Sequence, residues 1–533
     1  MASFSQQGSS AERGDKFKPF KSFSTPVDDS KTPPKGTVQG SIWNFLRFLF
    51  RTWGDAFMSV PHSWTDPTVI WTTFLYARTT TVILFFVLVL DVAIKLPRGR
   101  RLYEKLTENK LGLTLVNSCY PEIFTHLQEE VSNAAFTTMS KRRAENKSTT
   151  YDRNFDLDVA KLLLVISALM YERQRPFPVN SDDPNAIICD HFVADIAQKY
   201  GLKYEPVTNV GSNSSAICGA FFSLNHNFII LAFKGTQPDD FNEWATDFSC
   251  DWAVAPEFLR GYSRVHRGFY EALFPSRLEK DKLPYDVIRL TLVEIAQRIR
   301  FGRPQTPPTS DGGDSPASNR GLTEVHPINV FVTGHSLGTA TASMFYARAI
   351  QRPGDLGPPG LIELNDAYLF ATPITVDVTS HAVFNGDMHP NSDEPPRTLW
   401  RITNKRDIVA TGLPCFGERE IFSSASAPNS RLNFCHLGQE IQMRDAPELS
   451  EQGPGTQLRG GSRVRIVSSL ASQPLGINFK DYKGGWGVFL RYGEYIPFFG
   501  RMAQHCPVFY LRSLSHMRIT WENESLKEVP FHW

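Results

Sequence analysis

The chain has 533 residues, and its 56 lysines and arginines nearly balance its 55 aspartates and glutamates, so the formal net charge is +1. This balance gives no electrostatic reason to expect a nucleic-acid partner. The seven cysteines are scattered without C-x-x-C spacing, which argues against a disulfide framework and against a zinc site. A chain of this length can bury a large core and still carry additional segments.

The N-terminal part divides into two kinds of sequence. Residues 1–40 are rich in Ser, Lys, Pro and Gly and poor in large apolar side chains, so we expect a disordered tail. Residues 42–53 mix aromatic side chains with Arg47 and Arg51, which is typical of a segment lying on a membrane. The alternative is a helix packed on the globular domain.

The strongest apolar run covers residues 75–96 and is interrupted by Asp91, which has Lys95 one helical turn away. Its length favours a membrane-spanning helix. An in-plane or re-entrant anchor and a buried helix of a soluble domain are the alternatives. We therefore predict a membrane-associated region over residues 41–150 with a candidate transmembrane helix at 75–96. Cationic residues beside a membrane helix tend to stay on the cytosolic side. The cationic residues that follow the run therefore favour a cytosolic location for the C-terminal part of the chain.

Residues 328–340, INVFVTGHSLGTA, combine an apolar β-branched run, a Gly-x-Ser-x-Gly motif and a small-residue run compatible with a helix. Strand, motif and helix in this order predict a nucleophile elbow with Ser336 at its tip. Side chains at Gly334 and Gly338 would collide with the neighbouring strand and helix, so glycine is expected at both positions.

Apolar runs that suit strands alternate with segments that suit helices in the rest of the chain. Strands are expected at residues 227–236, 366–371 and 398–403, and helices at 159–171 and 285–300. This alternation predicts an α/β fold with a mostly parallel sheet covered by helices on both faces. Residues 301–327 are expected to be a disordered insertion, and residues 375–397 a loop insertion.

A nucleophilic serine needs an imidazole, and the imidazole needs a carboxylate that fixes its tautomer. Asp407 follows an apolar strand and suits the acid. His505 is favoured as the base because it precedes an apolar helical run and lies on a loop that can reach across. His516 and His436 remain alternatives.

The oxyanion formed on attack needs at least two hydrogen-bond donors. One is the backbone N–H of Leu337, the residue after the nucleophile. The other is expected from the loop after an earlier strand, where Thr236 follows Gly235 and offers an amide and a hydroxyl.

Several of these stretches, in this order, resemble the class 3 lipases, a family of fungal triacylglycerol lipase-like α/β-hydrolases. The resemblance covers roughly residues 150–520 and is carried by FKGT at 233–236, NEW at 242–244 with Asp247, VHRGF at 265–269, GHSLG at 334–338, RDIV at 406–409, HLGQE at 436–440, and His505 with YL at 510–511. It implies an α/β-hydrolase domain over residues 151–533. It also implies Ser336 as nucleophile, Asp407 as acid, His505 as base, and Thr236 and Leu337 as oxyanion donors. Two departures are Gln504, where the family has Asp, and Ile374, where a basic residue is common.

The resemblance further implies a lid over residues 238–255, with Phe241 and Trp244 as candidates; a fixed surface loop is the alternative. The expected function is a membrane-associated serine lipase that cleaves acylglycerol esters through an acyl-enzyme, without cofactor or metal. Its expected partners are a lipid substrate and a membrane or lipid-droplet surface, with an endomembrane location and a cytosolic catalytic domain. A phospholipase A, thioesterase or acyltransferase, or an inactive scaffold with the same fold, are the alternatives.

Overall fold

The computed structural model of the protein describes residues 37–62, 64, 67–99, 101, 116, 121–125, 127–141, 153–173, 184–208, 217–236, 252–254, 256–275, 283–302, 326–388, 397–411, 434–443, 464–467 and 497–522. The expected tail falls outside these residues up to residue 36, whereas residues 38–40 already belong to the first helix. The interior of the expected 301–327 insertion and the lid candidates Phe241 and Trp244 also lie outside them.

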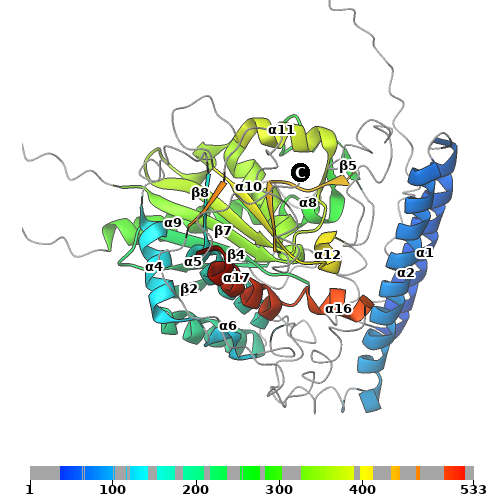
Figure 1. Ribbon diagram of the computed structural model, residues 1–533, viewed down its shortest axis with the longest axis horizontal. Coiled ribbons are helices and arrows are strands. Elements are labelled where there is room, and N and C mark those ends of the chain that lie inside the picture. The colour runs from blue at the N-terminus through cyan, green and yellow to red at the C-terminus, as the bar shows by residue number, and fades with distance from the viewer. Residues whose placement is uncertain are drawn as a thin grey trace, which may run out of the picture.

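A seven-stranded sheet forms the centre of the α/β domain, in the order β12-β10-β8-β7-β4-β3-β2 (Figure 1). The strands from β12 to β4 run parallel, and β3 and β2 are added antiparallel at one edge. Their bounds are β12 Gln439–Met443, β10 Leu399–Asn404, β8 Ile362–Phe370, β7 Ile328–His335, β4 Phe228–Phe233, β3 Cys218–Phe222 and β2 Lys203–Pro206. The prediction of a mostly parallel sheet is confirmed.

Two smaller sheets accompany the central one. The first has the order β11-β9-β6-β5, with antiparallel pairs throughout, and the second pairs β1 with β13 in parallel. Their bounds are β1 Arg153–Asp156, β5 Trp252–Val254, β6 Arg264–His266, β9 Val376–Asp377, β11 Phe434–Cys435 and β13 Val464–Val467. Strand β5 falls within the expected lid segment, so the end of that segment is held in a sheet.

Alternate residues of the central strands supply two separate hydrophobic cores, because successive side chains of a strand point to opposite faces of the sheet. In β4, Phe228 and Ile230 belong to the core under α4, α5 and α17. Ile229 and Leu231 belong to the core under α8, α9 and α10. Both faces are therefore covered by helices, as the continuous apolar character of the strands predicts.

The helices on the first face are α4 Glu129–Ser140, α5 Leu157–Leu169, α6 Pro184–Lys199 and α17 Pro507–Glu522. On the second face lie α8 Arg267–Leu273, α9 Pro284–Phe301, α10 Leu337–Gln351 and α11 Val378–Met388. Two short helices, α12 Ile408–Thr411 and α16 Pro497–Ala503, flank the site described below, and the 3₁₀ turns are η2 Val60–His62, η3 Pro121–Phe124, η5 Met170–Glu172 and η7 Pro353–Leu356. A strand, a sharp turn and α10 at the centre of this sheet make the architecture that of an α/β-hydrolase.

Helix α5 is the central helix of the first face. Every residue from Leu157 to Leu169 is buried, and the helix packs against α4, α17 and β7. The Asp156 carboxylate caps its start by accepting hydrogen bonds from the backbone N–H groups of Asp158 and Val159. The prediction of a core helix at residues 159–171 is confirmed, with a start two residues earlier.

Residues 375–397 were expected to form a loop insertion, and this expectation is wrong for their first part. Residues 376–377 form β9 and residues 378–388 form α11. Phe384 and Met388 bury their side chains, and the buried Ser380 hydroxyl accepts from the backbone N–H groups of Ser263 and Arg264. Tertiary packing therefore stabilises a helix whose composition resembles a loop.

Helices α1 (Val38–Ser59) and α2 (Pro67–Lys95) form an antiparallel hairpin beside the α/β domain (Figure 1). Helix α2 begins eight residues before the expected apolar run, and its residues 73–95 are long and apolar enough to cross a membrane. The sequence did not predict that α1 would pack along α2. The α1–α2 pair is called the hairpin below.

Candidate active site

The turn between β7 and α10 holds Ser336 in an unusual backbone conformation. Its φ is 56° and its ψ is −132°, a region that residues with side chains rarely adopt. The backbone N–H of Ser336 donates to the Phe370 carbonyl at 2.9 Å, and its carbonyl accepts from the Thr339 N–H at 3.0 Å. These bonds hold the strained turn between the neighbouring strand β8 and the first turn of α10.

The two glycines of the motif sit where a side chain would strike backbone. A methyl group added at Gly334 would lie 2.9 Å from the Gly338 carbonyl carbon, and one added at Gly338 would lie 2.4 Å from the Phe233 carbonyl oxygen. Gly334 therefore lets the strand approach the helix, and Gly338 lets the helix approach the end of β4. The steric expectation for both positions is confirmed.

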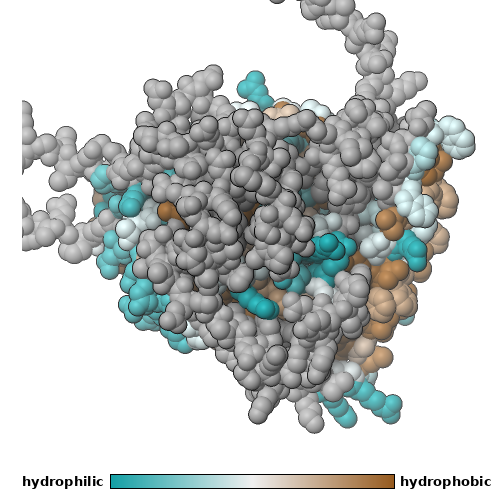
Figure 2. Space-filling view, viewed as in Figure 1, coloured by the Kyte–Doolittle hydropathy of each residue, from teal (hydrophilic) through white to brown (hydrophobic). Residues whose placement is uncertain are grey.

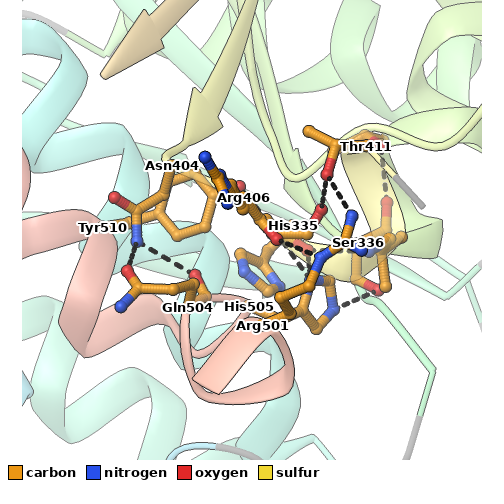
Figure 3. A network of polar contacts seen from close by, with 12 residues as sticks. His335, Ser336, Asn404, Arg406, Thr411, Arg501, Gln504, His505 and Tyr510 are labelled. Atoms are coloured by element: carbon orange, nitrogen blue, oxygen red, sulfur yellow. Dashed lines mark hydrogen bonds and ion pairs between the residues drawn. The ribbon is translucent and has the colours of Figure 1, made fainter. Parts of the chain in front are cut away.

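The structure brings Ser336, His505 and Asp407 together in one chain of hydrogen bonds. Figure 3 shows the His505 ring beside Ser336. The Nε2 atom of His505 lies 2.9 Å from Ser336 Oγ, and its Nδ1 atom lies 3.0 Å from each carboxylate oxygen of Asp407. All three side chains are buried. With Asp407 ionised, Nδ1 carries the proton and its N–H donates a hydrogen bond to the carboxylate. Nε2 is then the acceptor for the serine hydroxyl.

Asp407 is held by further donors. The Tyr510 hydroxyl donates to Oδ2 at 2.6 Å, and the Val409 backbone N–H donates to Oδ1 at 2.8 Å. Burial acts to raise the pKa of Asp407, but the opposing interactions with His505, Tyr510 and Val409 prevail. They hold the pKa below its ordinary value of 3.8. The carboxylate therefore stays ionised and can orient the imidazole.

The loop that carries His505 is tied to the strand that leads to Asp407. Asn404, the last residue of β10, donates through its side-chain amide to the Gln504 carbonyl at 3.0 Å and to the Gln504 amide oxygen at 2.8 Å (Figure 3). On the other side, Arg501 donates to the Arg406 carbonyl and to the Thr411 hydroxyl, each at 3.1 Å. Gln504 departs from the family pattern, but its bonds to Asn404 hold the loop that carries His505.

His335, directly before the serine, is a second imidazole at the site. Its ring centroid lies 4.9 Å from that of His505, and its Nδ1 atom lies 2.9 Å from the Tyr171 hydroxyl. Complete burial, reinforced by the neighbouring His505, holds the pKa of His335 well below its ordinary value of 6.5. The ring is therefore neutral at physiological pH and adds no charge that would oppose the imidazolium of His505.

The two candidate oxyanion donors, Leu337 and Thr236, lie next to the turn that holds Ser336. Leu337 is the first residue of α10, where backbone N–H groups are not used within the helix. Thr236 follows Gly235, at which an added methyl group would lie 2.5 Å from the His335 carbonyl oxygen. The close approach at Gly235 brings the chain after β4 against the elbow.

The alternative histidines have other surroundings. His436 is buried between β11 and β12, and its carbonyl lies 2.7 Å from Nδ1 of His381. His516 belongs to α17, and its side chain is outside the described part of the chain. His505 is the histidine whose ring contacts Ser336 in the part of the chain that the structure describes.

Sequence reasoning missed the partners Tyr171, His335, Asn404 and Arg501, and it noted Tyr510 only as part of an aromatic helix. Tyr510 follows His505 by five residues on the next helix, α17, so its spacing was a usable signal. The others depend on contacts between segments distant in sequence. Tyr171 and His335, for example, are separated by 164 positions.

Residues 230–416 match the family model for lipase (class 3). The chain therefore contains a class 3 lipase domain. The match includes Ser336 and Asp407 and ends before His505. Helices α5 and α17 lie outside the matched residues but cover one face of the same sheet. The folded unit around the class 3 lipase domain thus extends beyond its matched residues on both sides.

Curated relatives agree with this assignment. The chain is 29% identical over 302 residues to triacylglycerol lipase OBL1 of Arabidopsis thaliana, and the match covers 54% of this chain and 53% of that protein. A shorter match to triacylglycerol lipase OBL1 of Nicotiana tabacum is 43% identical over 47 residues, which are 9% of this chain and 8% of that protein. The chain thus matches about half the length of the Arabidopsis relative.

Solved structures that resemble the chain include other lipases. The Rhizomucor miehei lipase propeptide complex has a TM-score of 0.33 and 18% identity, with 55% of this chain and 69% of that chain covered. Lipase II from Rhizopus niveus has a TM-score of 0.31 and 18% identity, with coverages of 52% and 79%. The class 3 lipase assignment rests on the sequence matches.

Proposed function

We propose that the protein is a membrane-associated serine lipase that hydrolyses acylglycerol esters through Ser336, His505 and Asp407. One observation carries this proposal: His505 contacts the Ser336 hydroxyl through one ring nitrogen and the Asp407 carboxylate through the other. The names of the plant relatives, both triacylglycerol lipases, support acylglycerols as the substrate class.

The first half-reaction forms an acyl-enzyme. Ser336 Oγ attacks the ester carbonyl carbon while Nε2 of His505 takes the hydroxyl proton. Thr236 and the Leu337 backbone N–H donate to the oxyanion. Asp407 stabilises the imidazolium that forms. The imidazolium then protonates the departing alcohol oxygen, and the ester C–O bond breaks.

The second half-reaction releases the fatty acid. Nε2 of His505 takes a proton from water, and the oxygen of that water attacks the acyl-enzyme carbonyl. Collapse of the second oxyanion returns the proton to Ser336 Oγ. In this proposal residues 238–255, with Phe241 and Trp244, form the lid over the acyl groove.

Membrane association is supported by α2. Residues 73–95 form an apolar helix of which 28% is buried, which does not suit the core helix of a soluble domain. The cationic residues Lys95, Arg98 and Arg101 at the end of this helix support a catalytic domain on the cytosolic side of an endomembrane or on a lipid-droplet surface.

The test is hydrolysis by the full-length protein in detergent, with triacylglycerol, diacylglycerol, phosphatidylcholine and a short-chain p-nitrophenyl ester as substrates. We expect acylglycerol turnover that Ser336→Ala abolishes. Ser343→Ala is the matched control, because Ser343 lies on α10 and donates to the Thr339 carbonyl. Faster turnover of phosphatidylcholine than of acylglycerols would instead support a phospholipase A.

A serine-reactive fluorophosphonate provides a second readout. It should label the wild type and Ser343→Ala, and it should fail to label Ser336→Ala. If the folded wild type is not labelled, the inactive-scaffold alternative is correct.

A further inference from the structure

The two helices of the hairpin contact each other along their length. The Trp53 indole N–H donates to the Thr81 hydroxyl at 3.0 Å in the middle of the pair, and Lys95 Nζ donates to the Ser41 hydroxyl at 2.8 Å at one end. Phe48 and Leu84 are buried between these points. The chain therefore enters and leaves the hairpin at the same end, and the turn around Trp64 forms the other end.

Helix α1 presents an exposed apolar stripe and a second stripe that is polar and partly exposed. Ile42, Leu46, Phe50 and Phe57, spaced four, four and seven residues apart, are exposed apolar side chains on one face of the helix. This second stripe carries Asn44, Arg47, Arg51 and Asp55, and the exposed Met58 follows it at the end of the helix. Helix α1 therefore has three faces: one packs on α2, one is apolar and one is polar.

Helix α2 extends the apolar surface. Its exposed large side chains include Trp71, Leu75, Val82, Phe85, Phe86 and Val89. The space-filling view shows brown side chains gathered along the outer edge that the hairpin forms (Figure 2). The ring centroids of Phe85 on α2 and Phe45 on α1 lie 6.2 Å apart, so the two helices are in aromatic contact at this point.

Charge around this apolar surface is mostly positive. The described residues of the hairpin and the segment after it include the cations Arg47, Arg51, Lys95, Arg98 and Arg101. Arg78 lies within the apolar face of α2, between Leu75 and Val82, and its long side chain can extend to the headgroups. Asp91, the acidic residue in the apolar run, forms an ion pair with Lys95 at 2.7 Å. Cationic side chains beside a large apolar face complement a lipid surface with anionic headgroups.

We propose that the hairpin lies in the plane of one anionic lipid leaflet and does not cross the bilayer. If α2 crossed, α1 would cross beside it, and the stripe of Asn44, Arg47, Arg51 and Asp55 would enter the hydrocarbon, where such groups are strongly disfavoured. In the in-plane orientation this stripe faces the headgroups and water, while the apolar side chains enter the acyl boundary. This inference rests on the proposed membrane association and specifies its geometry.

Accessibility of the hairpin turn tests this geometry. Full-length Trp64→Cys protein is added to sealed vesicles of phosphatidylcholine with phosphatidylserine, then treated with a membrane-impermeant maleimide. Modification of the peptide that contains residue 64 is read by mass spectrometry, because the chain has seven other cysteines. We expect labelling as extensive as at the control position Arg98→Cys. Protection of residue 64 until detergent opens the vesicles would overturn the proposal.

Flotation with the same vesicles tests the two stripes. Phe50→Glu should weaken vesicle binding by about tenfold or more, because it removes apolar area and adds repulsion. Asn44→Glu adds the same charge on the polar stripe and should change binding by only about two- to threefold. Equal losses in both variants would contradict the in-plane orientation.

Varying the lipid composition of the vesicles tests whether the apolar face binds a lipid surface or a protein partner. Omitting phosphatidylserine should weaken binding by about tenfold, and added salt should weaken binding to the anionic vesicles. Failure of the wild type to float with either vesicle would show that the apolar face is covered by something other than lipid. Hydrolysis of the soluble p-nitrophenyl ester in detergent is measured in parallel, so a failure here is distinguishable from a failure of the proposed lipase function.

Discussion

Asn404 fixes the position of Gln504 through one side-chain amide that donates to both oxygens of that residue, at 3.0 and 2.8 Å. Asn404 ends the strand that leads to Asp407, and Gln504 directly precedes His505. The acid and the base therefore reach the site from segments that are hydrogen-bonded to each other. The Asn404 amide oxygen also accepts from Ser513 on α17 at 2.8 Å, so this residue joins strand, loop and helix.

Asn404→Ala should lower the turnover number more than Gln504→Ala, because the first variant removes both bonds to Gln504 and the second removes one. Displacement of the His505 ring should cost about 10- to 100-fold in kcat with little change in KM. The measurement is steady-state hydrolysis of a soluble ester. Gln442→Ala, which loses a bond to the Lys405 carbonyl, is a control that should retain activity. Losses that multiply in the double variant would contradict the coupling.

Tyr510→Phe should raise the pKa of Asp407, because the carboxylate loses the hydroxyl that donates to Oδ2. A buried charge-assisted hydrogen bond is worth about 1–3 kcal/mol, so stability should fall by a similar amount. The acid limb of the profile of kcat/KM against pH should move to higher pH. Tyr346→Phe removes a buried hydroxyl that donates to the Asn365 carbonyl, so it should lose stability without that movement. An unmoved acid limb in Tyr510→Phe would contradict the assignment.

Gly338→Ala should destabilise the protein and abolish activity. The added methyl group would lie 2.4 Å from the Phe233 carbonyl oxygen and 2.8 Å from the Lys234 carbonyl carbon, and backbone atoms cannot rotate away. We expect a loss of about 2–4 kcal/mol in the free energy of unfolding, measured by denaturant titration. Gly354→Ala is the matched control: a methyl group there meets nothing within 4 Å, so stability should change by less than about 0.5 kcal/mol. Similar losses in both variants would refute the steric explanation.

Asp156 makes stability depend on pH. Burial, followed by smaller contributions from its neighbours, raises the pKa of this carboxyl from 3.8 to about 6. Because the folded-state pKa is the higher one, folding takes up a proton between these values. The resulting stability is fully present below pH 3.8 and is lost as the pH rises through about 6.

Asp156→Asn should remove this dependence and keep an acceptor for the α5 cap. Relative to the variant, the wild type should become less stable by about 2 kcal/mol between about pH 4 and about pH 7. The comparison uses the free energy of unfolding of both proteins at the two pH values. A difference that stays constant with pH would show that Asp156 is already ionised in the folded protein at acid pH.

The elbow was predictable because its causes are local. The strain at Ser336 and the close approach between Gly334 and Gly338 lie within one short motif, and the same motif predicted the central strand and helix, whereas the approach of Gly338 to Phe233 depends on the neighbouring strand β4. His505 could be favoured from its loop position and the helix after it. The sequence alone could not exclude His436, because the choice depends on how α17 packs across the sheet.

Other features depend on contacts that no local pattern encodes. Helix α11 forms because Phe384 and Met388 are buried, although its segment has the composition of a loop. The apolar run at 75–96 suggested a single anchor, and the helix paired with it became apparent only when Trp53 was found against Thr81. The catalytic partners Tyr171 and Asn404 likewise belong to segments far from the residues that they orient.

Helix α17 supplies Tyr510 to the acid and also forms one wall of a hydrophobic core, while His505 stands just before it. A ribosome makes this stretch after Ser336 and Asp407, which precede it in the chain. In the proposed mechanism, a nascent polypeptide that lacks this stretch therefore has Ser336 without its base. In the proposed mechanism, ester cleavage requires α17 to dock, so we expect activity to begin only when this core has formed.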